Sequence, residues 1–196
     1  MPPERPLRIC IVSPGLMDLY RSSGERQVGG TEVMSDLLAR HLAPLAEVHV
    51  VTDDPGEPLR TPPYRLHALP LGEALRSRPR VLAGWRYLRR LSRALRAIDP
   101  DVLLQHCSGM EAFVMARHAR RHGKRFVYHW GADSDLTGLM VPGRPVLAAL
   151  FRWGRRHADL QLCQTEHQLG LLGEAERRRA VLFPNPLNTR VPWRRS

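Results

Sequence analysis

Short apolar runs alternate with longer amphipathic segments along most of the chain. The short runs predict strands, and the longer segments, whose apolar residues recur at helical spacing, predict helices. This alternation favours an α/β fold: a doubly wound, mostly parallel sheet with helices on both faces. The predicted strands are 7–12, 47–52, 64–69, 102–106, 124–129, 158–163 and 180–183, and the longer helices are 31–42, 79–98, 109–122 and 145–156.

Two glycines, Gly29 and Gly30, stand directly before the first predicted helix. Thr31 is the predicted N-cap, because its hydroxyl can accept a hydrogen bond from an N–H group of the first turn. Glycine lets a ligand approach the backbone, and a helix N-terminus favours negative charge. Two interpretations remain open: a corner that binds an anion, or a turn that leads the chain into the helix.

Polar residues collect where the predicted strands end. Ligands of doubly wound sheets bind outside the carboxyl ends of the strands, so these positions are candidates for a site. His129 ends one strand and precedes a loop containing Gly131 and two aspartates. A histidine there can bind a substrate hydroxyl or move a proton near neutral pH; bonding to neighbouring backbone is the alternative. The polar strand ends are Ser13, 53–54, 106–108, 129–135 and 164–166.

The formal net charge of +11 is the strongest deviation in composition, and Lys124 is the only lysine. The arginines reflect either codon bias or an anionic partner, for which nucleotides, phospholipid surfaces and nucleic acid are candidates. Helix 79–98 is basic and amphipathic, so it is either a packed helix with a solvated face or a helix that docks on anionic lipid. Its apolar stripe is Val81, Trp85, Leu88, Leu91, Leu95 and Ile98, and its arginines include Arg86, Arg89, Arg90, Arg93 and Arg96.

Several functional classes are disfavoured by missing motifs. The sequence contains no dinucleotide fingerprint, phosphate loop, serine-hydrolase elbow, CxxC or HExxH. His118 and His122 lie four residues apart, and we interpret them as a solvated pair rather than metal ligands. Nucleic acid is not an expected partner, because aromatic residues are few and no helix–turn–helix is evident.

We expect a cytoplasmic protein. The first six residues are polar and proline-rich, and no segment approaches the roughly 20 apolar residues that span a bilayer. The three cysteines, Cys10, Cys107 and Cys163, are widely spaced and lie in or just after apolar runs, as is typical of reduced thiols in a core. A peripheral position on the inner face of the membrane would follow if helix 79–98 docks on lipid.

Taken together, the motifs resemble the N-terminal, acceptor-side half of a family 4 glycosyltransferase. That family is retaining and has the GT-B fold, so the resemblance implies a Rossmann-like domain that forms one half of such a fold. The resemblance covers nearly the whole chain. It rests, in order, on Gly29-Gly30-Thr31-Glu32, residues 47–52, Asp99-Pro100-Asp101-Val102 with His106, His129 with its acidic loop, residues 158–166, and Phe183-Pro184-Asn185-Pro186-Leu187-Asn188.

The resemblance also implies roles for individual residues. His129 would lie beside the transferred sugar, with Asp133 as the second catalytic candidate. Gly29, Gly30 and Thr31 would approach the donor diphosphate, and Asn185 would lie at the interdomain hinge. The acceptor would be bound by His106, Ser108, Asp135, Gln164 and Glu166.

The implied reaction is transfer of a hexose from a nucleotide-sugar to a glycan or lipid-linked acceptor with retention. Retention in the family is usually attributed to front-face attack assisted by the leaving diphosphate, which needs no dedicated nucleophile. The nucleotide-sugar would be a co-substrate, and no cofactor or divalent metal is expected. Two departures from the family pattern stand out: Trp130 follows His129, and Pro186 follows Asn185.

The resemblance places the domain at 1–188 and assigns 189–196 to the start of an interdomain linker or a C-terminal tail. The donor-binding C-terminal domain would be absent. We therefore expect a fragment, a truncated enzyme, or one chain of a split enzyme whose partner chain supplies that domain. Alone it should fold but not transfer sugar. The alternative is a non-catalytic α/β module that binds an anionic glycolipid or sugar phosphate.

Overall fold

A computed structural model describes residues 5–20, 29–53, 61–69, 80–106, 109–133, 135 and 145–184. Within them, seven strands form one sheet in the order β3-β2-β1-β4-β5-β6-β7, and every neighbouring pair is parallel. The predicted doubly wound α/β fold is confirmed. The strands are β1 Arg8–Val12, β2 Glu47–Asp53, β3 Arg65–Leu69, β4 Val102–His106, β5 Arg125–His129, β6 Leu160–Cys163 and β7 Ala180–Leu182.

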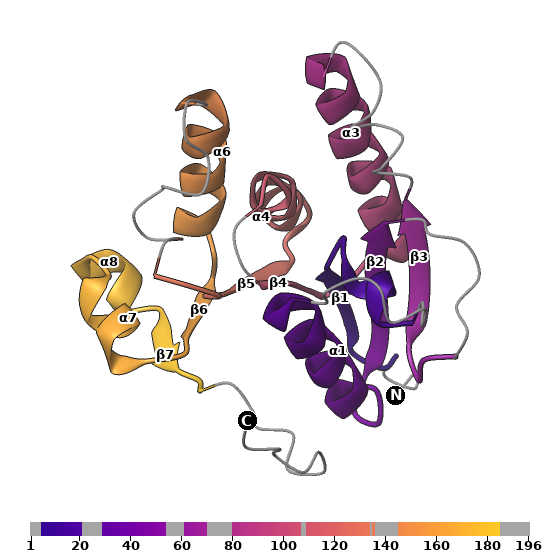
Figure 1. The fold of residues 1–196 in the computed structure, drawn as a ribbon, viewed down its shortest axis with the longest axis horizontal. Helices are drawn as coiled ribbons and strands as arrows, with labels where there is room; N and C mark the ends of the chain where they lie inside the picture. Colours follow the sequence, from indigo (N-terminus) through magenta and orange to yellow (C-terminus); the bar gives the residue numbers. More distant parts are fainter. Residues whose placement is uncertain are drawn as a thin grey trace, which may run out of the picture.

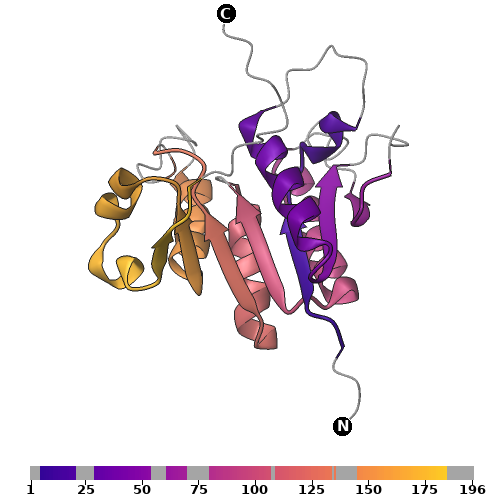
Figure 2. The ribbon, with the colours of Figure 1, turned by 90° about the horizontal axis from the view of Figure 1, so that it is seen from below.

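Helices cover both faces of the sheet (Figure 1). α3, α4 and α6 lie on one face and α1 on the other, while α7 and α8 lie at the β7 end (Figures 1 and 2). The chain therefore leaves β1 and β4, which are neighbours, toward opposite faces, and this is the topological switch point of the sheet. The helices are η1 Leu16–Leu19, α1 Gly30–Leu42, α3 Arg80–Ile98, α4 Glu111–His122, α6 Pro145–Arg156, α7 Glu166–Leu171 and α8 Glu174–Arg177, where η1 is a 3-10 helix.

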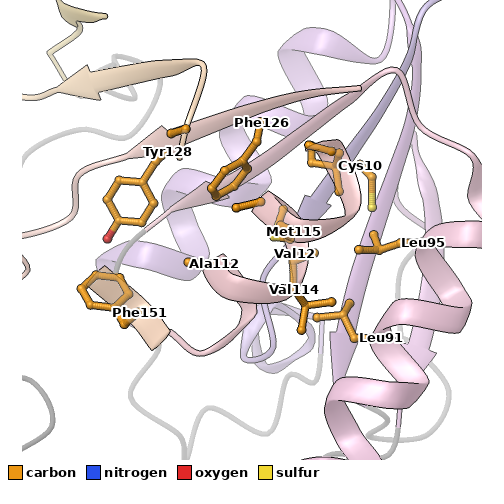
Figure 3. Close-up of a cluster of buried hydrophobic side chains, with 14 of the residues drawn as sticks. Cys10, Val12, Leu91, Leu95, Ala112, Val114, Met115, Phe126, Tyr128 and Phe151 are labelled. Carbon is orange, nitrogen blue, oxygen red and sulfur yellow. The ribbon is translucent and has the colours of Figure 1, made fainter. Parts of the chain in front are cut away.

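The larger core lies between the sheet and helices α3, α4 and α6 (Figure 3). Phe126 and Tyr128 of β5 meet Met115 of α4 there, and each is fully buried. Cys10 is also fully buried, and its thiol is free, as the sequence predicted. A second core packs β1 and β2 against α1 and η1. Apolar residues on both sides of each strand are expected of a parallel sheet that helices cover on both faces.

Helix α1 begins one residue earlier than predicted. Its N-cap is Gly29, which has extended backbone angles (φ −77°, ψ 161°), and no side chain caps it. Thr31 lies inside the first turn, so its prediction as N-cap is wrong. Glycine can replace a capping side chain here because, at the N-cap, it lowers helix stability only slightly relative to Ser, Thr, Asp or Asn. Helix α7 does have a capping side chain: the hydroxyl of its N-cap, Thr165, accepts a hydrogen bond from the backbone N–H of Gln168 at 3.1 Å.

The buried stripe of α3 also differs from the prediction. Tyr87 is buried and Trp85 is 60% exposed. Both stripes have helical spacing, so only the packing of the helix against the sheet decides between them. Among residues 84–98, whose side chains the structure describes, the buried ones are Tyr87, Leu91, Leu95 and Ile98; the predicted Val81 lies outside this part of α3.

His118 is not solvated as predicted. It is only 6% exposed, and its ring lies 4.5 Å from that of His122, centroid to centroid. Among the described residues, no group of three or more His, Cys, Asp or Glu side chains is placed to hold a metal ion. None of the helices in the described part of the chain has both the length and the apolar character needed to cross a bilayer.

Candidate functional site

A cavity of about 620 Å³ lies at the carboxyl edge of the sheet, over the switch between β1 and β4. This is the place at which doubly wound folds bind their ligands. The ends of β1 and β4, the N-termini of α1 and α4, and the segments that follow β5 and β6 all contribute to it. Its described lining residues are Val12, Ser13, Pro14, Gly15, Gly30, Thr31, Glu32, Gln105, His106, Glu111, Gly131, Ala132, Asp135 and Gln164.

Two histidines meet at the ends of β4 and β5. These strands pair with His106 opposite His129, and the two Nδ1 atoms lie 2.8 Å apart. Burial lowers the pKa of His106 to about 4. Burial and then the charge of His106 lower the pKa of His129 to about 3. Both rings are therefore neutral at pH 7, and one Nδ1–H donates a hydrogen bond to the other Nδ1.

His106 lines the cavity, whereas His129 lies behind it. His129 is fully buried, the centres of its ring and that of Phe183 lie 5.6 Å apart, and its Nε2 has no hydrogen-bond partner among the described residues. A role for His129 at the transferred sugar therefore requires action through His106 or a rearrangement that exposes its ring. That role stays a prediction.

The acidic loop after β5 is shaped by one of its own carboxylates. Asp135 Oδ2 accepts hydrogen bonds from the backbone N–H of Gly131 at 3.1 Å and from the hydroxyl of Tyr128 at 3.3 Å. Asp135 is 2% exposed and lines the cavity. Asp133 is more exposed, accepts a hydrogen bond from Gln168 at 3.2 Å, and is not among the lining residues. Of the two aspartates, Asp135 is therefore the one that a ligand in the cavity would meet.

Trp130 does not enter the cavity. Its indole is fully buried and donates a hydrogen bond to Gln161 at 3.1 Å, and the guanidinium of Arg155 lies 4.8 Å from the centre of its ring. The amide of Gln164 donates to the backbone carbonyl of Trp130 at 2.6 Å, which holds β6 against the loop. The bulky residue after His129 thus packs into the core without narrowing the site.

Glu111 belongs to the cavity and was missed by the sequence analysis. It is the first residue of α4, is 9% exposed, and receives a hydrogen bond from the hydroxyl of Tyr87. Burial raises the pKa of its carboxyl above the ordinary value of 4.5. Its position in the first turn of the helix after β4 is the sequence signal that could have found it. Ser13 lines the same cavity and is 3% exposed, and its hydroxyl has no hydrogen-bond partner in the described part of the chain.

The glycine corner faces the cavity through Gly30 and Thr31. A Cβ atom added at Gly15 or at Gly29 would lie 2.6 Å from a carboxylate oxygen of Glu32, whereas one added at Gly30 would meet nothing within 4 Å. Gly15 and Gly29 therefore make room for the Glu32 carboxylate at the N-terminus of α1. A negative charge is favourable there.

The charge of the cavity is opposite to that of the whole chain. Three carboxyl groups, those of Glu32, Glu111 and Asp135, line it, and no arginine or lysine is among its described lining residues. The N-termini of α1 and α4 favour anions, while the side chains favour neutral or cationic, hydroxyl-rich ligands.

The predicted site residues fall into three groups. Gly30, Thr31, His106, Asp135 and Gln164 line the cavity. Gly29, His129, Asp133 and Glu166 are described but are not lining residues; Glu166 is exposed in the first turn of α7. Ser108 and Asn185 lie outside the described residues.

The sequence matches the family model of Glycosyltransferase Family 4 over residues 28–191. The chain belongs to glycosyltransferase family 4. A search of curated proteins finds no match. Membership of the family confirms the resemblance inferred from the motifs.

Solved structures with the same fold include a synthase, MurG and an epimerase bound to UDP-GlcNAc. Sucrose-phosphate synthase of Thermosynechococcus elongatus has a TM-score of 0.62 at 13% identity, covering 91% of this chain and 48% of the synthase. MurG of Acinetobacter baumannii has a TM-score of 0.57 at 12% identity, covering 93% of this chain and 47% of MurG. UDP-GlcNAc 2-epimerase of Neisseria meningitidis, bound to UDP-GlcNAc, has a TM-score of 0.54 at 12% identity, covering 89% of this chain and 45% of the epimerase. The chain thus spans about half the length of these proteins and has the fold of one Rossmann-like half of GT-B.

Proposed function

We propose that this chain is the acceptor-side domain of a retaining glycosyltransferase that moves a hexose from a nucleotide-sugar to a glycan or lipid-linked acceptor. The domain extends over 1–188, with 189–196 leading into a linker or tail. Transfer requires a donor-binding domain, supplied in the same polypeptide or by a partner chain. The nucleotide-sugar is a co-substrate, and neither a cofactor nor a divalent metal is needed.

One observation carries the proposal: the cavity at the switch point has polar groups for hydroxyls but no basic side chain among its described lining residues. His106, Gln164 and the carboxyl of Asp135 can bind acceptor hydroxyls. A departing diphosphate needs positive groups that stabilise its charge. On this side the described lining offers only the partial positive charge of the N-termini of α1 and α4. The remaining positive groups belong to the donor-binding domain.

The same charge pattern disfavours the alternative of a module that binds an anionic glycolipid through the glycine corner. The side chains of Glu32 and Asp135, which line the cavity, disfavour a ligand that carries its own negative charge, and no basic side chain among the described lining residues offsets them.

In the reaction, an acceptor hydroxyl held in the cavity attacks the anomeric carbon on the face from which the diphosphate leaves. The anomeric C–O bond to phosphate breaks as the bond to the acceptor oxygen forms, and the acceptor proton passes to the departing phosphate oxygen. The protein then contributes position and electrostatics rather than a nucleophile. His106 orients the acceptor, and His129 holds the His106 ring through the contact between their Nδ1 atoms.

The experiment compares the 196-residue chain with the gene product isolated in its native form, whose intact mass is set against 22.3 kDa. Both are incubated with a panel of nucleotide-sugars, and the anomeric configuration of the sugar in the product or released to water is read by NMR. We expect transfer with retention from the native form when it carries or recruits a donor-binding domain, and none from the isolated chain. Turnover by the isolated chain at an enzyme-like rate, or inversion, would refute the proposal.

A further inference from the structure

A second hollow, of about 450 Å³, lies between α3 and α4. We call it the α3–α4 groove. Four arginines line it, Arg89 and Arg96 from α3 and Arg117 and Arg121 from α4, and all four are exposed. His118 and His122 complete its polar wall. It is separate from the cavity at the carboxyl edge of the sheet, with which it shares no lining residue.

The groove arginines are not neutralised within the described part of the chain. Arg96 donates a hydrogen bond to the hydroxyl of Ser92 at 3.0 Å, and no carboxylate oxygen there lies within 4.0 Å of any of the four guanidinium groups. Elsewhere in the protein arginines do find such partners, as Arg40 does with Asp36 at 2.8 Å. Four unneutralised guanidinium groups facing one hollow raise the local potential, which attracts an anion.

His118 supports the same conclusion from inside the groove. Only 6% of its area is exposed, and within the ranges that the structure describes its Nε2 has no hydrogen-bond partner. A buried polar atom without a partner costs stability unless a ligand or water satisfies it. Burial, and then the charges of His122, Lys124 and Arg96, lower the pKa of His118 to about 4. The cations that surround it therefore outweigh the single acidic neighbour, Asp99.

The apolar part of the groove indicates which kind of anion fits. Trp85, 60% exposed, lies in its wall with Leu88, Phe113 and Val114. An exposed tryptophan beside arginines is typical of surfaces that meet the membrane interface, where the ring contacts the glycerol and upper acyl region and the cations contact phosphates. A small soluble phosphate would gain nothing from these apolar side chains.

We propose that the α3–α4 groove binds the phosphate of an anionic phospholipid headgroup, with Arg89 and Arg117 facing it from the two helices and Trp85 at the interface. Arginine suits this chemistry because its planar fork bonds two phosphate oxygens at once. The binding needs neither donor nor acceptor and holds whether or not the cavity transfers sugar. It assigns four of the chain's arginines to one phosphate site.

The test is sedimentation of the protein with vesicles made of equal parts of phosphatidylcholine and phosphatidylglycerol, against vesicles of phosphatidylcholine alone. A groove variant, Arg89→Gln with Arg117→Gln, is compared with a matched control, Arg86→Gln with Arg93→Gln. The control removes the same charge from exposed positions of α3 that do not line the groove. All substituted residues are on the surface, and circular dichroism confirms that each variant is folded.

We expect the wild type to sediment with the anionic vesicles only, the groove variant to bind roughly thirtyfold more weakly, and the control to lose less than about threefold. Equal losses in both variants would mean diffuse attraction and would overturn the proposal. So would a wild type that stays in the supernatant. In a parallel titration, inorganic phosphate that shifts the His118 ring signals in NMR while vesicles do not would identify a soluble phosphate as the ligand, and this too would overturn it.

Discussion

At the scale of single residues, the contact between His106 and His129 couples the candidate site to the stability of the fold. Both rings lie at strand ends, their Nδ1 atoms are 2.8 Å apart, and both pKa values are lowered by burial. A histidine whose pKa is lower in the folded state stabilises the protein fully above pH 6.5, the unfolded value. This stability is lost as the pH falls from 6.5 toward the folded pKa.

His129→Asn tests this linkage. The Asn amide can replace Nδ1–H as a donor to His106 but does not titrate. We expect the free energy of unfolding, measured with urea between pH 4 and pH 6.5, to fall less steeply with acidification, by up to about 1.4 kcal/mol per pH unit. His118, whose pKa is also lowered, makes stability fall with acidification as well. The variant should therefore keep part of the pH dependence of the free energy of unfolding. The control is His41→Asn on α1, an exposed position; identical slopes in all three proteins would contradict the assignment.

Glu111→Gln is expected to have the opposite dependence on pH. Because burial raises the pKa of Glu111, the folded state favours its protonated form, and stability is lost as the pH rises from 4.5 through the folded pKa. The amide keeps an oxygen for the Tyr87 hydroxyl and carries no charge. At pH 7 the variant should be more stable than the wild type by on the order of 1 kcal/mol, and at pH 4 the difference should vanish. The control is the exposed Glu166→Gln, and a variant less stable than wild type at pH 7 would argue against a buried carboxylate.

At the scale of helices and strands, the close contact of α4 and α6 depends on a glycine. A Cβ atom at Gly154 would lie 2.5 Å from the backbone nitrogen of Phe113 and 2.6 Å from the carbonyl oxygen of Ala112. Since the obstacle is backbone, it cannot move aside as a side chain could.

Gly154→Ala should therefore force α6 away from α4 and lower the free energy of unfolding by about 2 kcal/mol, measured by urea denaturation. Gly170→Ala in α7 is the matched control, because a Cβ atom there meets nothing within 4 Å. It should leave stability unchanged or raise it by up to about 1 kcal/mol, since alanine favours the helix. Equal effects of the two substitutions would show that α4 and α6 are less closely packed than the distances at Gly154 indicate.

Most elements could be predicted from the sequence because strand and helix periods differ strongly. The runs at 102–106 and 145–156 correspond to β4 and α6 with the same bounds. Which side of α3 packs against the sheet could not be predicted in the same way. Stripes through Trp85 and through Tyr87 both fit the helical period, and the sheet, which the local sequence does not specify, buries Tyr87.

The candidate site was predictable to the extent that it lies at strand ends. His106 ends β4, and Asp135 and Gln164 follow β5 and β6; since these strands are neighbours, one rule brings the three residues together. Glu111 does not follow from this rule, because it lies in a helix and lines the same cavity as Ser13 only because β1 and β4 are neighbours. The position of His129 behind His106 depends on which way two strand ends point, and the local pattern does not encode that.

At the scale of the whole molecule, charge is separated. The chain carries a formal net charge of +11, yet the described lining of the switch-point cavity has three carboxyl groups and no basic side chain. Four arginines face the α3–α4 groove instead. This separation fits a domain whose cavity receives a hydroxyl-rich acceptor while its basic helices face an anionic surface, and whose donor phosphates are neutralised by another domain.

The central claim is that sugar transfer takes place in the switch-point cavity. The most direct measurement is the transfer rate of the native gene product carrying Ala132→Trp, which fills the cavity from an exposed position, against Ala149→Trp, an exposed position of α6 outside it. We predict that Ala132→Trp lowers the rate about a hundredfold or more, since small displacements of a bound acceptor are costly, and that Ala149→Trp transfers like the wild type. Wild-type transfer by a folded Ala132→Trp protein would contradict the account.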